Sequence, residues 1–137
     1  MKFVPYLSFG GDCREAFEFY ADVLDGELVG MTTHGEMPDD GHGFPGWQDK
    51  IINAHLIAEG AELMGADSPP EMGDNTMNGF SVSIQIDDEA RGARIFEAFS
   101  KGGKVIMPFE KTFWARKFGM VTDRFGTPWM INCGMAG

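Results

Sequence analysis

The sequence is poor in cysteine. Among its 137 residues there are only two cysteines, Cys13 and Cys133. Neither belongs to a CxxC motif or to a Cys/His spacing that would close a zinc site. A disulfide between them would need a suitable Cα separation and an oxidising compartment, and the sequence indicates neither. We therefore expect two free thiols.

Positive charge and long apolar runs are also scarce. Lysine and arginine together number 11 against 21 aspartates and glutamates, which gives a net charge of −10 and a pI near 4.6. Such a chain repels a phosphate backbone, so nucleic acid is not an expected partner. No apolar run approaches the roughly 18 residues of a membrane span, and no signal-type segment is present. We expect a cytoplasmic protein with no membrane partner.

Large apolar side chains, by contrast, are plentiful. Hydrophobic residues make up 43% of the chain and include 12 phenylalanines and 10 methionines. A chain of this length fits one packed core without disulfide or zinc staples. We interpret residues 1–137 as a single domain.

The first half, residues 1–68, is expected to form a βαβββ module. Asp12 and Glu15 give a capping-box-like start to a helix of about three turns that Gly26 ends. Strands are expected at residues 3–9, 27–33, 50–59 and 61–66. The last two form a hairpin hinged at Gly60. Residues 34–49 are too rich in glycine and proline for a regular element, and residues 69–78 are a linker.

The second half, residues 79–137, repeats this order. A constant shift along the chain places Asp12 on Asp88 and Gly26 on Gly102, so Asp88 opens the second helix. Strands are expected at residues 80–86, 104–107, 113–121 and 128–133, the last two joined by a turn at 123–126. This pattern predicts an α+β fold of two tandem βαβββ modules. Their curled antiparallel sheets would each carry a helix on one face and surround a concave ligand pocket with the other.

Several segments resemble one known family. They are Pro5-Tyr6-Leu7-Ser8-Phe9, the Phe19-Tyr20 pair before Gly26, and the spaced series Trp114, Gly119, Asp123, Phe125-Gly126, Trp129. They resemble the PhnB-like branch of the vicinal oxygen chelate superfamily, also called the glyoxalase/bleomycin resistance/dioxygenase superfamily. The resemblance implies the two-module fold with a concave pocket, and usually a homodimer. Its members range from metal-dependent enzymes to metal-free drug-binding proteins, so the fold alone does not fix the function.

The resemblance also implies where metal ligands would lie. Metal-using members place His and Glu side chains on the first, fourth, fifth and eighth strands, and a site with an open position needs about three such ligands. The first, fifth and eighth positions fall here at Val4 or Pro5, within residues 79–81, and at Met130. Only Glu62, with His55 on the neighbouring strand, is suitable. We therefore expect no metal cofactor, with His55 and Glu62 as weak candidates if a divalent ion is bound.

Some PhnB-like sequences are also named as ubiquinone-pathway methyltransferases. We do not expect that activity, because the chain shows no strand-to-helix glycine-rich loop suited to a nucleotide-like cofactor.

Seven residues are candidate ligand contacts: Tyr6, Ser8, His55, Ser83, Trp114, Arg116 and Trp129. Tyr6 and Ser8 share one face of the first strand, and Ser83 shares one face of the fifth with Gln85, because side chains alternate along a strand. Hydroxyl and amide groups there can orient a small ligand. A solvated strand face is the alternative.

The remaining candidates also have alternatives. His55 either lines the pocket or is a hydrogen-bonded structural histidine. Trp114 and Trp129 stack on a planar ligand or fill the core, and core packing is favoured for Trp129. Arg116, followed by Lys117, makes a positive spot for a carboxylate or phosphonate, unless both lie at a solvated strand edge.

The loop over residues 34–49 carries two histidines and two aromatic residues. His34 and His42 are interpreted as surface histidines. Phe44 and Trp47 suit either a lid over the pocket or an anchor on a partner subunit.

The leading hypothesis is a metal-free or metal-degenerate protein of the superfamily that binds a small organic molecule, as a homodimer. The alternative is a divalent-metal-dependent glyoxalase- or dioxygenase-type enzyme acting on a small oxygenated substrate. A third possibility is an interaction dimer without a ligand.

Overall fold

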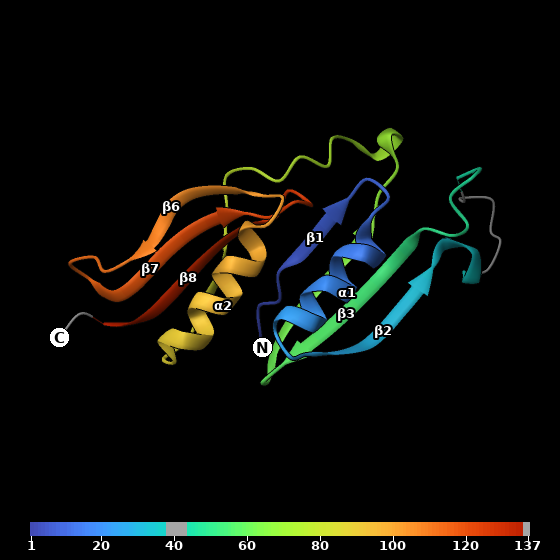
Figure 1. Cartoon of the computed structure of the whole chain (residues 1–137). Helices are drawn as coiled ribbons and strands as arrows, with labels where there is room; N and C mark the ends of the chain where they lie inside the picture. The colour runs from blue at the N-terminus through green and yellow to red at the C-terminus, as the bar shows by residue number, and fades with distance from the viewer. Residues whose placement is uncertain (38–43, 136–137) are drawn as a thin grey trace. The chain divides into compact units, whose positions relative to one another are not determined.

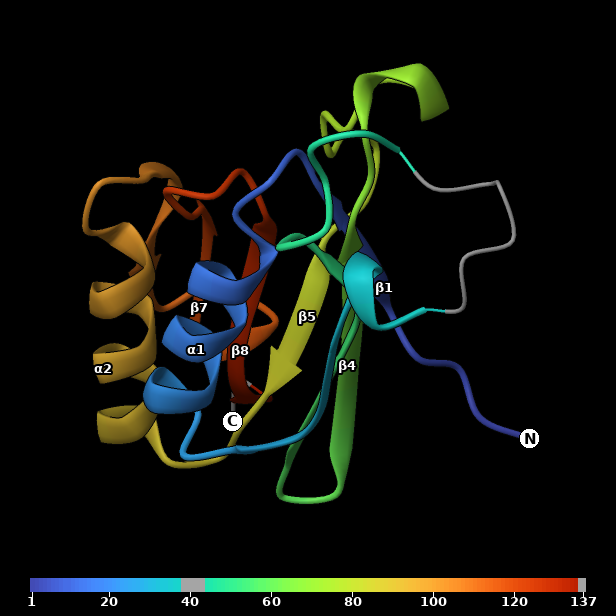
Figure 2. The same cartoon turned by 90° about the vertical axis from the view of Figure 1, so that its right-hand side faces the viewer.

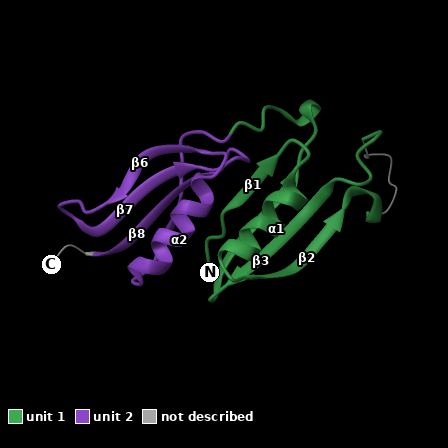
Figure 3. Ribbon diagram, viewed as in Figure 1, with its two compact units in different colours: residues 1–76 green, residues 77–137 purple. Residues whose placement is uncertain are grey.

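The computed structural model describes residues 1–37 and 44–135, and the chain divides into two compact units. The units comprise residues 1–76 and 77–137 (Figure 3). Their boundary falls inside the segment expected to be a linker. The interpretation of residues 1–137 as one domain stays a prediction.

The first unit has the expected βαβββ order (Figure 1). Its elements are β1 (Tyr6–Phe9), α1 (Cys13–Val23), β2 (Glu27–Thr33), β3 (Ile51–Ala58) and β4 (Ala61–Asp67), with short 3-10 turns η1 (His34–Glu36) and η2 (Pro70–Met72). The β3–β4 hairpin turns at Glu59 and Gly60, which both have positive φ, of 52° and 82°. Two successive positive φ values are typical of the type I′ turn that fits the twist of a hairpin.

The second unit repeats the order. Its elements are β5 (Val82–Gln85), α2 (Glu89–Ser100), β6 (Lys104–Glu110), β7 (Ala115–Thr122) and β8 (Pro128–Met135). The turn expected before β8 is confirmed, since Gly126 N donates to Asp123 O at 3.0 Å. The predicted glyoxalase/bleomycin resistance/dioxygenase fold, with its two βαβββ modules, is therefore confirmed.

The sheets are mixed, so the prediction of antiparallel sheets was wrong at one strand pair in each. The strand orders are β1-β4-β3-β2 and β5-β8-β7-β6, with β1 parallel to β4 and β5 parallel to β8. The helix carries the chain back across the sheet, so the strands before and after it run in the same direction. Two antiparallel connections then return the last strand to that direction, which makes it parallel to the first strand beside it.

The start of α1 differs from the predicted capping box. Asp12 is the N-cap residue but makes no side-chain capping hydrogen bond. The buried carboxylate of Asp67, at the end of β4, takes that role: its Oδ1 accepts from Gly11 N at 2.9 Å and Cys13 N at 3.0 Å. Its Oδ2 accepts from Ile51 N at 2.9 Å. One carboxylate thus joins β4 to the β1–α1 turn and to the start of β3.

The second helix is capped as predicted. The Asp88 side chain accepts a hydrogen bond from Arg91 N at 3.1 Å.

Each helix covers one face of its own sheet (Figure 2). In the first unit Phe17 and Tyr20 of α1 are fully buried, together with Leu7 and Phe9 of β1. In the second unit Phe99 of α2 stacks on Trp129 with ring centroids 4.5 Å apart. The two cores therefore lie between helix and sheet, and the opposite faces of the sheets are where candidate binding residues remain.

The predicted free thiols are confirmed, and both are buried. Burial raises the pKa of the Cys13 and Cys133 thiols, which favours their protonated form.

No helix in the part of the chain that the structure describes is long and apolar enough to cross a membrane.

Candidate functional site

The face of the first sheet opposite α1, here called the first open face, carries most of the candidates from the first half of the chain. Strand pairing aligns Tyr6 with Met64 and Met64 with His55, so all three project from the same side. The predicted alternation in β1 is confirmed: Leu7 and Phe9 are buried, Tyr6 is exposed and Ser8 is half-buried. Tyr6, Ser8 and His55 therefore share one face.

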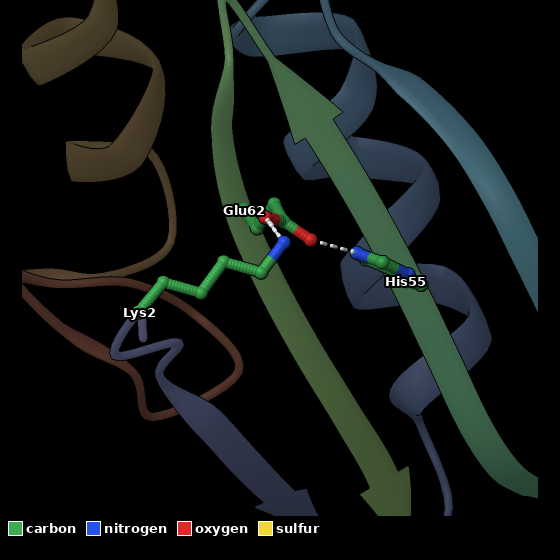
Figure 4. A network of polar contacts seen from close by, with 3 residues as sticks. All are labelled: Lys2, His55 and Glu62. Atoms are coloured by element: carbon green, nitrogen blue, oxygen red, sulfur yellow. Dashed lines mark hydrogen bonds and ion pairs between the residues drawn. The ribbon is translucent and has the colours of Figure 1, made fainter.

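An ionic network crosses the first open face. His55 Nε2 donates to Glu62 Oε1 at 2.7 Å, and Lys2 Nζ donates to the other carboxylate oxygen. The three side chains meet on the side of β3 and β4 that faces away from α1 (Figure 4). The Glu62 and His55 side chains are only 14% and 26% exposed, whereas Lys2 is 70% exposed. Hydrogen bonds from Lys2 and His55 hold the pKa of Glu62 below its ordinary value.

Replacing Lys2 by methionine is expected to raise the pKa of Glu62 toward the ordinary glutamate value. Lys2 is the largest cause of the lowered pKa, and methionine keeps much of the side-chain length without the charge. The measurement is a ¹³C NMR titration of the Glu62 carboxyl carbon in both proteins. Because this pKa is lowered by folding, the stabilisation from Glu62 is present at neutral pH and is lost as the pH falls through it.

Lys101, an exposed lysine at the end of α2, provides the matched control. Lys101→Met should leave the Glu62 titration unchanged. A Lys2→Met protein whose Glu62 titrates as in the unmodified chain would show that the ion pair does not hold in solution.

Tyr6 adds a neutral hydroxyl to the same face. Its hydroxyl donates to Asn53 Oδ1 at 3.3 Å, with Ile52 O at 3.4 Å as a second acceptor. Burial raises the pKa of the Tyr6 phenol, so it remains a hydrogen-bond donor at neutral pH. Tyr6 and Asn53 thus orient polar groups beside His55.

His55 and Glu62 are the two side chains to consider as ligands of a metal ion. Across residues 1–37 and 44–135, no group of three or more His, Cys, Asp and Glu side chains is placed to hold an ion. The predicted weak pair, His55 and Glu62, does come together, but each Glu62 oxygen already accepts from a protein nitrogen. A divalent ion there would compete with the Lys2 ammonium for the carboxylate.

The corresponding face of the second sheet, here called the second open face, carries Ser83 and an amide chain. Asn132 Nδ2 donates to Gln85 Oε1 at 2.8 Å, and Gln85 Nε2 donates to Ser83 Oγ at 2.7 Å. Strand pairing aligns Ser83 with Met130 and Gln85 with Asn132. Met130, which falls where the resemblance placed a carboxylate, therefore puts a thioether on this face.

Arg116, expected to contribute to a positive spot, lies near two acidic residues. Its Nη2 donates to Asp87 O at 3.0 Å, and its guanidinium nitrogens lie 3.8 Å from Asp87 Oδ1 and 3.5 Å from Glu89 Oε2. Gly134 permits this path, because a Cβ there would lie 2.4 Å from Arg116 Nη2. The charge of Arg116 is thus shared with two acidic residues, which weakens its attraction for an anionic ligand.

The two candidate tryptophans have different surroundings. Trp129 is 1% exposed, stacks on Phe99 and donates from Nε1 to Asp123 Oδ2 at 2.8 Å. It is a core residue, so its inclusion among the ligand contacts was wrong and the favoured alternative was right. Trp114 is 43% exposed and packs edge-on against Phe113 and Phe118, with centroids 4.8 and 5.3 Å away. Trp114 therefore remains a candidate contact.

Of the two histidines in the loop over residues 34–49, only His34 lies among the described residues. His34 is half-buried, its Nε2 lies 3.1 Å from Asp67 O, and its ring meets Trp47 edge-on at 6.1 Å. It therefore fastens the loop to the end of β4 rather than standing free on the surface. His42 lies outside the described residues. Whether Phe44 and Trp47 form a lid or an interface stays a prediction.

Three residues of these networks were missed in the sequence. Asn53 lies two positions before His55 in a strand, so the period-two rule would have placed it on the same face. Asn132 has the same relation to Met130. Lys2 precedes every expected element, and no local pattern indicates that it pairs with a glutamate 60 residues away.

Comparison with known proteins places this architecture in a fold class. A glyoxylase/bleomycin resistance protein/dioxygenase domain from Frankia superposes with a TM-score of 0.65 at 15% identity, covering 98% of both chains. The PhnB protein from Bacillus cereus, described as a putative 3-demethylubiquinone-9 3-methyltransferase, gives a TM-score of 0.78 at 24% identity, covering 98% of this chain and 100% of its own. Both likenesses define the vicinal oxygen chelate fold.

A nearer relative and a family model narrow the class. Protein PA1353 from Pseudomonas aeruginosa is 42% identical, with a TM-score of 0.91 and 99% of both chains covered. The family model described as 3-demethylubiquinone-9 3-methyltransferase matches residues 1–132. The chain belongs to this family and has the fold of the vicinal oxygen chelate superfamily.

Proposed function

We propose that the protein binds a small organic molecule on an open face of one of its sheets, without a metal ion, and acts in the cytoplasm. The observation that carries this proposal is the Lys2–Glu62–His55 network beside Tyr6 and Asn53. It supplies oriented polar groups on a face that its own helix does not cover. Binding sites commonly combine a few such fixed polar groups with apolar surroundings.

Each open face, taken by itself, also carries apolar side chains. Met64 lies between Tyr6 and His55 on the first, and Met120 pairs with Met130 on the second. Methionine side chains are flexible and polarisable, and they adapt to ligands of irregular shape. Trp114, still 43% exposed, offers a ring for stacking beside the second open face.

Charge balance in the network favours a metal-free site. The Glu62 carboxylate is already compensated by an ammonium group, and its two oxygens are both used. Binding a divalent ion would cost the Lys2 ion pair and would still supply only two protein ligands, whereas catalytic sites typically use three.

We therefore expect the purified protein to hold well under one divalent ion per chain. The measurement is elemental analysis of protein prepared without chelator, with His55→Ala and His34→Ala variants alongside. His34 is the matched control, because its Nε2 contacts a backbone oxygen. One tightly held ion per chain, lost in His55→Ala but kept in His34→Ala, would contradict the proposal and favour the metal-dependent enzyme.

We do not propose methyl transfer, the activity that the family's description names. The turn between β1 and α1 contains Gly10 and Gly11 and is the kind of place where backbone amides bind an anionic cofactor group. Here the amides of Gly11 and Cys13 donate to the buried Asp67 carboxylate instead. An internal anion already occupies the donors that a cofactor would need.

The proposed assembly is a homodimer. Val105, Ile106 and Met107 of the edge strand β6 are 45%, 50% and 36% exposed, and Phe113 in the following turn is 92% exposed. Exposed apolar groups of this kind are typical of surfaces that a partner covers. A second copy of the chain is the partner that we propose.

A further inference from the structure

We propose that the second open face selects ligands that carry a hydrogen-bond donor, a hydroxyl or N–H group, which pairs with Asn132 Oδ1. The apolar part of the ligand would lie on Met120 and Met130. This inference rests on the proposed small-molecule function and adds the chemical group that the ligand must present.

The register places two rows of side chains across this face. Phe118 pairs with Asn132, and Asn132 with Gln85. In the neighbouring row Met107 pairs with Met120, Met120 with Met130, and Met130 with Ser83. Side chains opposite each other on one face are close enough to touch, so a polar row lies beside a thioether row.

The polar row has a direction. Asn132 donates to Gln85, and Gln85 donates to Ser83. Each amide nitrogen therefore uses one hydrogen in this series of hydrogen bonds, and Gln85 Oε1 is used as an acceptor. The side-chain oxygen of Asn132 takes no part in this series of hydrogen bonds.

That oxygen is both buried and unpaired. Among the described residues, Asn132 Oδ1 is the single buried side-chain oxygen or nitrogen without a hydrogen-bond partner. Buried polar atoms are nearly always paired in folded proteins, and an exception calls for an explanation. A hydrogen-bond donor on the ligand that reaches this oxygen removes the free-energy cost of leaving the acceptor unpaired. A ligand that carries only acceptors does not.

Asn132 lies beside an aromatic pair. Phe118 is the cross-strand neighbour of Asn132 and is 9% exposed, and the Trp114 ring that packs against it is 43% exposed. Exposed side chains change rotamer within nanoseconds, and methionines adapt their shape readily. The Trp114 ring and the methionine side chains are the groups that would rearrange to admit a small planar molecule.

The test compares two probes that differ in one hydrogen-bond donor. 2-Naphthol carries a hydroxyl, and 2-methoxynaphthalene carries the same rings with an acceptor oxygen only. In the unmodified protein we expect 2-naphthol to bind about tenfold more tightly, as one recovered hydrogen bond implies. Methionine-methyl NMR shifts of Met120 and Met130 should follow the binding. Equal affinities, tighter binding of the ether, or no binding of 2-naphthol would overturn the inference.

Asn132→Leu tests the assignment to this residue, because leucine has a similar shape and no oxygen. It should remove the preference for 2-naphthol, whereas Asn75→Leu should keep it. Asn75 lies outside both sheets, and its amide nitrogen donates to Ser68 O at 2.7 Å. A preference that survives Asn132→Leu would contradict the inference. Probes that bind with equal affinity would refute the donor requirement and leave the proposed small-molecule binding standing.

Discussion

Replacing Asp67 by alanine is expected to lower the free energy of unfolding by about 3 kcal/mol or more, since three backbone amides lose a charged acceptor together. The carboxylate is 2% exposed, so water cannot readily replace it. Its partners lie in the β1–α1 turn and at the start of β3, so the loss loosens the part of the fold that holds the first open face. Urea unfolding followed by circular dichroism measures the change.

Asp74→Ala provides the matched control for Asp67. Asp74 is exposed, and its carboxylate accepts from the amide and hydroxyl of Thr76, at 2.9 and 2.7 Å. A surface substitution of this kind should stay within about 0.5 kcal/mol. Equal effects of the two substitutions would mean that the Asp67 hydrogen bonds do not organise the first unit.

Phe17→Ala is expected to cost about 3–5 kcal/mol, the usual range for truncating a buried aromatic residue. Phe17 is fully buried and meets Phe9 and Tyr20 edge-on, with centroids 6.1 and 5.7 Å away. Its ring also packs so closely on β4 that a Cβ at Gly65 would lie 2.7 Å from Phe17 Cε1. The helix-to-sheet contact of the first unit depends on this ring.

Tyr6→Ala and Trp114→Ala should each cost much less than Phe17→Ala. Tyr6 is 53% exposed and Trp114 is 43% exposed, so their truncation leaves no sealed cavity. The same thermal or urea unfolding series measures all three variants. If either loss equals that of Phe17→Ala, the residue concerned belongs to a core and is not available to a ligand.

Local sequence patterns predicted the helices, strands and turns, because these elements depend on residues that are close together in the sequence. The helix opened by Asp88 and the turn at Asp123–Gly126 both formed as expected, since their signals are hydrogen bonds across a few residues. The cap of α1 could not be predicted in this way, because it comes from Asp67, 54 residues after Cys13. The parallel pairing of β1 with β4 likewise depends on tertiary arrangement, which strand alternation does not encode.

For the candidate sites too, local patterns were predictable from the sequence and long-range contacts were not. Alternation correctly placed Tyr6 and Ser8 on one face of β1, and Glu62 does lie beside His55 on the neighbouring strand. The partners that decide the chemistry, Lys2 for Glu62 and the acidic residues for Arg116, are set by side-chain reach across the fold. Trp129 was misassigned because a tryptophan on a strand looks the same in sequence whether it faces the helix or the open side.

Native mass spectrometry of the protein purified from its own host without chelator tests the central claim most directly. It reports the assembly, the bound metal and any retained organic molecule in one spectrum. The account predicts a species of twice 15.1 kDa that carries a small organic ligand and no stoichiometric divalent ion. A species with one divalent ion per chain and no organic molecule would contradict it.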